Sequence, residues 1–150
     1  RQIETFKISF NGHRFDVIVP PQAVIVWGDE SKIEVVLNNL FESITSLSSP
    51  GERVIIEIRE EASKVVVSIG NERAYIPPHD LNRMFELFPC LDSREAQTAS
   101  GQGLGLYIAR KLMDSQGGAI WAESQVERGL RFSFSLPRLE LKSGKENPDH

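Results

Sequence analysis

The sequence has 150 residues, of which 40% are hydrophobic and 25% are charged, so it is long enough to bury the core of one globular domain. Its 17 Lys and Arg residues against 21 Asp and Glu residues give a net charge of −4. This balance excludes a protein that coats nucleic acid and leaves no polybasic patch for direct membrane contact. The single cysteine, Cys90, excludes an internal disulfide, and no Cys/His spacing suggests a zinc site. No apolar run reaches the roughly 18 residues that span a bilayer, and no signal peptide opens the chain. We therefore expect a cytoplasmic domain cut from a longer polypeptide.

The first third of the chain begins with strands. Alternating apolar and polar residues predict strands over 5–10 and 15–19, and the turn signal Asn11-Gly12 joins them as a hairpin. Pro20-Pro21 then breaks the pattern, and a short apolar run follows over 24–27.

The apolar period then changes to that of a helix. Asp29 or Ser31 is a good N-cap, and the Ser48–Gly51 turn provides the stop. Apolar residues recur every three to four positions at Ile33, Val36 or Leu37, Leu40, Ile44 and Leu47. This stripe predicts one amphipathic helix that packs against the core.

The rest of the chain predicts two further helices and two strand pairs. In order these are strands over 54–58 and 65–69, a helix from Pro78 or His79 to Phe88, a polar loop over 89–102, a helix over 103–116, and strands over 119–124 and 130–136. Residues 139–150 read as a flexible linker or tail, which leaves 1–138 as the domain. The order predicts an α+β fold, a two-layer sandwich in which three helices cover one face of a mixed, mostly antiparallel sheet.

The glycine-rich loop before the third predicted helix carries the strongest functional signal. Gly101, Gly103 and Gly105 allow backbone N–H groups to approach an anion, and the helix N-terminus behind them favours negative charge. Taken alone the pattern also fits a flexible hinge into a helix. It is not a Walker A loop, because no Gly-Lys-Ser/Thr follows, and the polar loop before it excludes a Rossmann turn.

The whole run from 101 to 124, GQGLGLYIARKLMDSQGGAIWAES, resembles the second glycine box, helix and strand of the catalytic ATP-binding domain of sensor histidine kinases. Trp27-Gly28-Asp29 resembles the lead-in to that family's first helix. Ile76-Pro77 followed by Met84–Phe88 resembles its phenylalanine box. The resemblance covers 24–136 and extends to the gyrase, chaperone and mismatch-repair ATPases.

The resemblance implies a Bergerat-type ATP-binding fold with ATP and Mg²⁺ between the helices. A mobile lid over 89–100 would cover the nucleotide, with Arg94 near the phosphates. The phosphates would lie on the second glycine box, at Gly101, Gly103, Leu104 and Gly105. The parent protein would be a two-component sensor or hybrid kinase.

The first functional helix departs from the family pattern. The family's Asn box, of the form NLLxNA, aligns with Asn39–Ile44, so the first Asn is retained as Asn39. The position whose amide ligates Mg²⁺ is Ser43, and a hydroxyl is a shorter and poorer ligand. The superfamily's ATP hydrolases place a general-base Glu where Asn39 stands, so the resemblance does not support hydrolysis by that route.

The first glycine box departs further. The family reads D-x-G-x-G-I-P, and this chain reads NERAYIP over 71–77. Asn71 retains a hydrogen-bond acceptor for the adenine amino group but loses the charge. Arg73 and Tyr75 replace both glycines, and we expect one of these side chains to cover the space for the base.

None of the three histidines fits the family's phosphoacceptor motif. His13 lies beside a predicted turn, His79 follows two prolines, and His150 ends the tail. The resemblance therefore implies that phosphoacceptor and dimerisation helices lie upstream in the same protein. It also implies that another sensor kinase or a response regulator is a further partner.

These departures lead to a principal hypothesis and two alternatives. The principal one is a degenerate pseudokinase module of a sensor kinase, with ATP and Mg²⁺ not bound tightly, that signals through protein contacts. The first alternative is a divergent but active kinase domain that transfers the ATP γ-phosphoryl group to a His on a separate domain. The second is an unrelated α/β binding module. In the first two readings the domain is cytoplasmic, or the cytosolic part of a membrane-bound sensor.

Overall fold

The computed structural model describes residues 4–10, 13–22 and 24–139. Its elements are β1 (Glu4–Phe10), β2 (His13–Val19), α1 (Glu30–Ser46), β3 (Arg53–Glu60), β4 (Lys64–Asn71), α2 (Pro78–Leu81), α3 (Arg94–Ser100), α4 (Gly105–Asp114), β5 (Ala119–Gln125) and β6 (Gly129–Pro137). The predicted turn at Asn11-Gly12 and the predicted tail beyond Leu139 lie outside the described residues. Within them, no helix has both the length and the apolar composition needed to cross a membrane.

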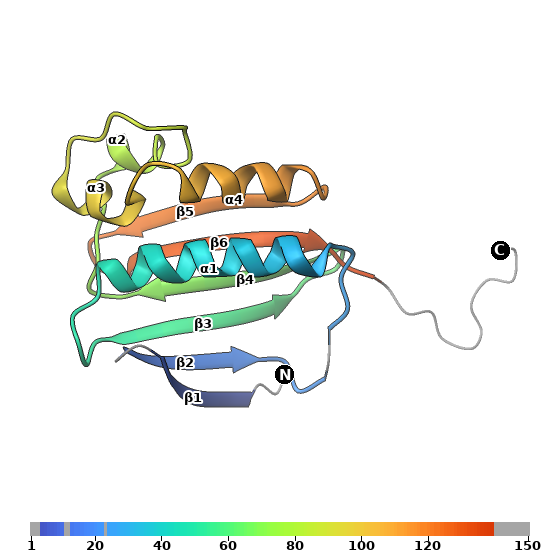
Figure 1. The fold of residues 1–150 in the computed structure, drawn as a ribbon. Coiled ribbons are helices and arrows are strands. Elements are labelled where there is room, and N and C mark those ends of the chain that lie inside the picture. The colour runs from blue at the N-terminus through green and yellow to red at the C-terminus, as the bar shows by residue number, and fades with distance from the viewer. Residues whose placement is uncertain (1–3, 11–12, 23, 140–150) are drawn as a thin grey trace, which may run out of the picture.

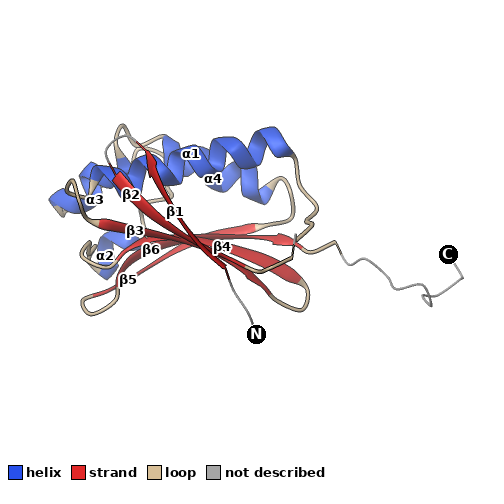
Figure 2. Ribbon diagram, turned by 90° about the horizontal axis from the view of Figure 1, so that it is seen from below, coloured by secondary structure: helices blue, strands red, loops and turns tan. Residues whose placement is uncertain are grey.

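The strands form one six-stranded sheet in the order β1-β2-β3-β4-β6-β5. Only β2 and β3 pair in parallel, because α1 connects them; all other neighbours are antiparallel. The helices lie on one face of the sheet, and none of the described elements covers the other face (Figure 1, Figure 2). This arrangement confirms the predicted α+β two-layer sandwich with a mixed, mostly antiparallel sheet.

Helix α1 is the central element of the helical layer. The Asp29 carboxylate caps it by accepting a hydrogen bond from the Lys32 N–H at 3.2 Å. Val36, Leu40 and Ile44 are fully buried in the core, as the three-to-four-residue spacing predicts. In Figure 1, α1 and α4 run side by side over the sheet.

Strand β6 supplies the largest side chains of the sheet's buried face. Leu130, Phe132, Phe134 and Leu136 are each at most 4% exposed, which confirms the predicted alternation. The Phe85 ring packs edge-on against Phe132 with 6.2 Å between the ring centroids. The first half of the predicted phenylalanine box, Met84 and Phe85, is therefore part of the core, whereas Leu87 and Phe88 are exposed.

The second predicted helix is shorter than expected. It was predicted to reach Phe88, but α2 ends at Leu81 and the chain continues in turns. Phe88 has a positive φ of 48°, and its N–H donates to the Gly103 carbonyl at 2.8 Å. The Phe88 N–H thus bonds to the glycine loop and not to a carbonyl of a continuing helix. The spacing of the apolar residues over 81–88 resembles that of a helix, which is why the sequence predicts one there.

The predicted loop over 89–102 contains the helix α3, so four helices, not three, cover the described sheet. The Ser93 hydroxyl caps α3 by accepting from the Ala96 N–H at 3.1 Å. Apolar residues do not recur at helical spacing in this segment, so hydrophobic periodicity does not predict α3. The local signal for the helix is the Ser93 cap followed by residues that favour helix formation. Helix α4 lies within its predicted range of 103–116.

Truncation of Leu40 tests the packing of α1. We expect Leu40→Ala to lower the free energy of unfolding by about 2–5 kcal/mol, because the side chain is fully buried. Chemical denaturation measures the loss, and Val35→Ala, at a 42% exposed position of the same helix, is the control. A loss below about 1 kcal/mol for Leu40→Ala would show that α1 is not packed as described.

Candidate functional site

The glycine loop takes a backbone course that requires two of its glycines. Gly101 and Gly103 have positive φ values of 62° and 81°. A Cβ on Gly103 would lie 3.0 Å from the Cα of Phe88, so that position also requires close approach of two backbones. Helix α4 begins at Gly105 without a side-chain cap. Its first N–H groups therefore remain available to an anion, as the sequence predicted.

A groove of about 500 Å³ lies where this loop meets α1. Its walls include Asn39 and Ser43 from α1, together with Gly101, Leu104 and Gly105. The Asn39 Oδ1 atom is 3.1 Å from the place that a Cβ on Gly105 would occupy, so a side chain there would press against Asn39. The structure thus brings the predicted Asn39 next to the predicted glycine loop.

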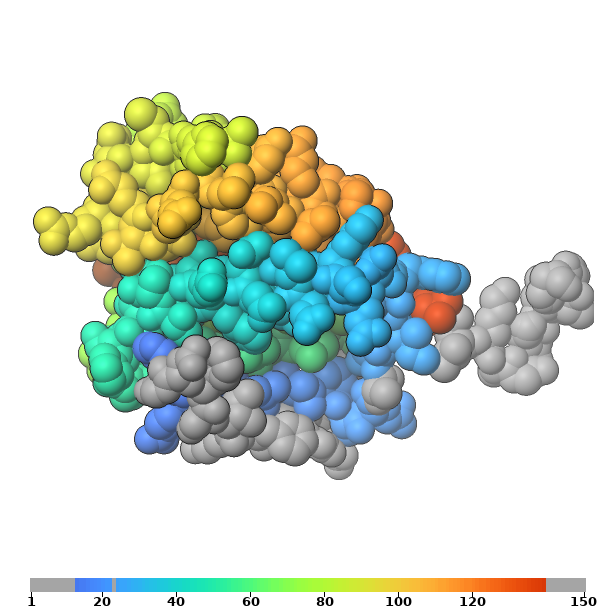
Figure 3. Space-filling model, in the orientation of Figure 1, coloured from blue at the N-terminus to red at the C-terminus, as the bar shows by residue number. Residues whose placement is uncertain are grey.

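Ser43 is buried and turned toward α3. Its hydroxyl donates to the Ala99 carbonyl oxygen at 2.8 Å. Ala96 and Ala99 are also buried and belong to the main hydrophobic core. Figure 3 shows α3 next to the end of α1, and residues of both helices line the groove. The predicted lid therefore contains a helix that packs as part of the core.

Asn71, at the end of β4, is bound to its own surroundings. Its Nδ2 group donates to the Ser48 hydroxyl at 2.7 Å and to the Glu52 carboxylate at 3.0 Å. Its Oδ1 atom accepts from the Arg73 N–H at 2.8 Å, and the side chain is 2% exposed. The hydrogen bonds from Asn71 and from the Ser49 N–H hold the pKa of Glu52 below its ordinary value. Asn71 does not line the groove.

The residues that replace the family's glycines do not line the groove. Arg73 and Tyr75 are exposed, while Ala74 and Ile76 take the buried positions of the segment. The groove lies at the glycine loop and Asn39, so the expectation that Arg73 or Tyr75 covers the space for a base stays a prediction.

The turn between β5 and β6 fixes the course of this segment. Gly129 has a φ of 82°, and a Cβ on it would collide with the Asn71 carbonyl oxygen and with the Glu72 backbone. The Gly129 backbone therefore packs directly against the backbone of Asn71 and Glu72, where β4 ends.

Other predicted residues lie outside the groove. Arg94 is the exposed first residue of α3 and does not line the groove.

His79, Asp80 and Asp92 offer ligand atoms within 4.8 Å of one another. Both Asp80 oxygens already accept backbone hydrogen bonds, at 2.8 Å from the Asp92 N–H and 2.6 Å from the Ser93 N–H. The sequence analysis missed Asp80, because no local pattern relates it to residues 12 and 13 positions later.

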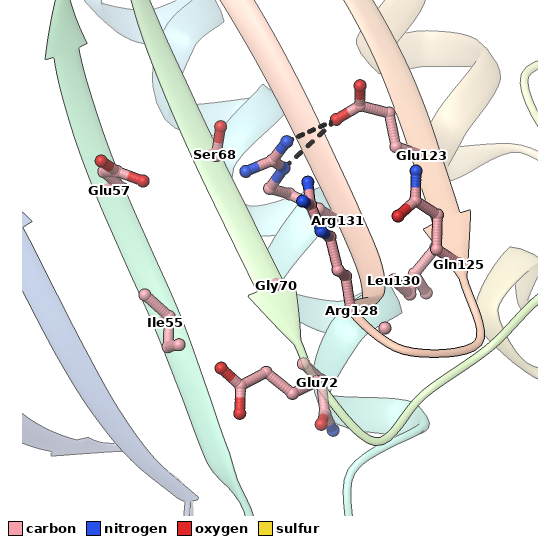
Figure 4. Close-up of a pocket in the computed structure, with 12 residues that line it drawn as sticks. Ile55, Glu57, Ser68, Gly70, Glu72, Glu123, Gln125, Arg128, Leu130 and Arg131 are labelled. Carbon is pink, nitrogen blue, oxygen red and sulfur yellow. Dashed lines mark hydrogen bonds and ion pairs between the residues drawn. The ribbon is translucent and has the colours of Figure 1, made fainter.

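A second hollow, of about 210 Å³, lies on the face of the sheet opposite the helices (Figure 4). Gly70 leaves space there, with Glu57 and Glu72 on one side and Arg128 on the other. Arg131 is paired with Glu123 at 2.7 Å. Charges of both signs surround the hollow, so it has no marked preference for an anion or a cation.

The hydrogen bond between Asn71 and Glu52 allows us to predict the effect of Asn71→Asp, which restores the family's residue at this position. Asn71→Asp places a second carboxylate beside Glu52, so the hydrogen bond that lowers the pKa of Glu52 is lost. In the native protein this stabilisation is present above the ordinary pKa of 4.5 and is lost as the pH falls through the lower folded value. We expect Asn71→Asp to cost about 1–3 kcal/mol at pH 7, measured by denaturation, and less near pH 4.

The double variant Asn71→Asp/Glu52→Gln is the matched control, because an amide at position 52 can donate to the new carboxylate. It should recover most of the loss. An Asn71→Asp protein as stable as the native one at pH 7 would contradict the contact.

Comparisons with known proteins agree with this geometry. The family described as histidine kinase-, DNA gyrase B-, and HSP90-like ATPase matches residues 28–140. Sensor histidine kinase WalK of Bacillus subtilis is 31% identical over 141 residues, which are 92% of this chain and 23% of that protein. Sensor protein SrrB of Staphylococcus aureus is 29% identical over 77% of this chain and 20% of its own length.

The solved catalytic domain of histidine kinase ThkA, in a nucleotide-free form, has a TM-score of 0.68 and 30% identity, covering 83% of this chain and 76% of its own. This chain spans about a quarter or less of the length of the curated relatives it matches. The chain belongs to the histidine kinase-, gyrase B- and HSP90-like ATPase family, as the catalytic ATP-binding domain of a sensor histidine kinase.

Proposed function

We propose that this domain is a degenerate member of its family, a pseudokinase module that binds nucleotide weakly and signals through protein contacts. The observation that carries the proposal is the hydrogen bond from Ser43 to the Ala99 carbonyl, with α3 buried against α1. The position whose amide would ligate Mg²⁺ in the family is used here to hold the lid helix.

The hydrogen bonds of Asn71 support weak recognition of an adenine ring. The Asn71 oxygen already accepts from its own loop, and its amide group donates to Ser48 and Glu52, so the side chain is held in place and has only one oxygen lone pair left for a base. Ala96 and Ala99 are buried in the core, and Ala99 also lines the groove beside Ser43. A Mg²⁺ ion at Ser43 is also disfavoured, because the hydroxyl is a shorter ligand than the family's amide and its hydrogen bond to Ala99 turns it toward α3.

The phosphate end supports the alternative of a divergent, active kinase domain. The glycine loop keeps its positive φ values, the first turn of α4 is uncapped, and Asn39 lines the groove. An anion could therefore still bind there through backbone N–H groups. In this alternative, the phosphoryl group would pass to a His on another domain, as none of His13, His79 and His150 lies in the family's motif.

The partners follow from the family and remain part of the proposal. The relatives are sensor kinases of which this chain matches only a minor part. We infer that dimerisation and phosphoacceptor helices of the same protein adjoin the domain, and that another sensor kinase or a response regulator binds it. By the same inference the domain acts in the cytoplasm, on its own or as part of a membrane-bound sensor.

Calorimetric titration with ATP tests the proposal. Two or three lost contacts, which together cost roughly 4–7 kcal/mol, weaken binding by about three to five decades. We expect a dissociation constant above about 1 mM, with no improvement when Mg²⁺ is added. A relative that retains the Asp-x-Gly-x-Gly box, titrated under the same conditions, is the positive control. A clear micromolar dissociation constant for this chain would favour the divergent kinase.

A further inference from the structure

Helix α3 is attached at its N-terminal end by Asp80. This carboxylate is 1% exposed, and its two oxygens accept from the Asp92 N–H at 2.8 Å and from the Ser93 N–H at 2.6 Å. Ser93 in turn caps α3 through the Ala96 N–H. One buried carboxylate therefore fixes the residues at which the helix begins.

The C-terminal end of α3 is attached by Ser43. Its hydroxyl donates to the Ala99 carbonyl, one of the last carbonyls of the helix, which have no partner within the helix. The next residue after α3, Gly101, turns the chain with a positive φ into the glycine loop. The two attachments thus lie at opposite ends of a seven-residue helix.

These two attachments have little apolar packing to assist them. The core-facing side of α3 consists of Ala96 and Ala99, with Ser100, while Arg94, Glu95, Gln97 and Thr98 are exposed. A helix of seven residues is not stable on its own in water. Small methyl groups bury little surface. The position of α3 therefore depends on the hydrogen bonds at its ends.

We propose that Asp80 and Ser43 form a lid clasp, two positioning residues that hold α3 against α1 beside the groove. Loss of either attachment lets α3 separate from α1 and exposes the surface around Ala96 and Ala99. The inference rests on the proposed function, because it makes the closed α3 a cause of weak nucleotide binding. The clasp makes closure a reversible property of the lid, in addition to the changes at Asn71, Arg73 and Tyr75.

Hydrogen exchange measured by mass spectrometry tests the clasp. Ser43→Ala removes the donor to Ala99, and Asp80→Asn replaces one acceptor oxygen with a donor. In each variant we expect the backbone amides of 92–103 to exchange at least about tenfold faster, while those of β4 and β6 keep their native rates.

Two matched variants control for the chemistry of the changes. Thr45→Ala removes a hydroxyl of the same helix that bonds only to α1 carbonyls. Asp92→Asn makes the same change as Asp80→Asn at an exposed side chain of the same cluster. Both should leave the exchange of 92–103 within about twofold of the native rate. Ser43→Thr retains the hydroxyl and should restore slow exchange.

Native exchange rates over 92–103 in a folded Ser43→Ala protein would overturn the clasp. If Asp80→Asn unfolds the whole domain, seen as fast exchange in β4 and β6 as well, Ser43→Ala and its Ser43→Thr rescue decide the question alone. ATP titration of the native chain is scored separately. Tight native binding with fast exchange only in the variants refutes the proposed function and retains the clasp, while weak binding with unchanged exchange does the reverse.

Discussion

The burial of one face of α1 is the constraint on which the rest of the domain depends. Val36, Leu40 and Ile44 fix the rotation of this helix about its axis, because any turn would expose them. Asn39 and Ser43, one turn apart, are therefore held toward the glycine loop and α3. The core residues thus set the direction of the site residues without taking part in the site.

This separation allows residues of the site to differ from the family pattern while the fold persists. The side chains that depart from the family pattern are exposed, as Arg73 and Tyr75 are, or form new internal bonds, as Ser43 and Asn71 do. Neither change removes buried apolar surface, which is the main source of stability. Residues of the site can therefore change while the buried core keeps the fold.

Local patterns predicted the elements whose stability is mainly a matter of buried apolar faces. The stripe of α1 and the alternation of β6 are of this kind, and both lie within a residue or two of the predicted ranges. The end of α2 and the presence of α3 depend on contacts between distant residues, namely Phe88 with Gly103 and Asp80 with Ser93. For the site, a family resemblance was needed to place Asn39 and the glycine loop in one nucleotide-binding site. The exposure of Tyr75 depends on the burial of its neighbours Ala74 and Ile76, and burial is not part of the family pattern.

The close approach of Gly129 to Asn71 determines which positions of the base end can vary. A side chain at 129 would strike two backbones and require a positive φ, so substitution there disturbs the hairpin and the neighbouring loop together. Positions 73 and 75 face solvent and carry no such limit. Positions 73 and 75 can therefore be substituted more easily than Gly129 at the tip of the β5–β6 hairpin. An engineered nucleotide site would be built by changing residues 73 and 75 and leaving Gly129 unchanged.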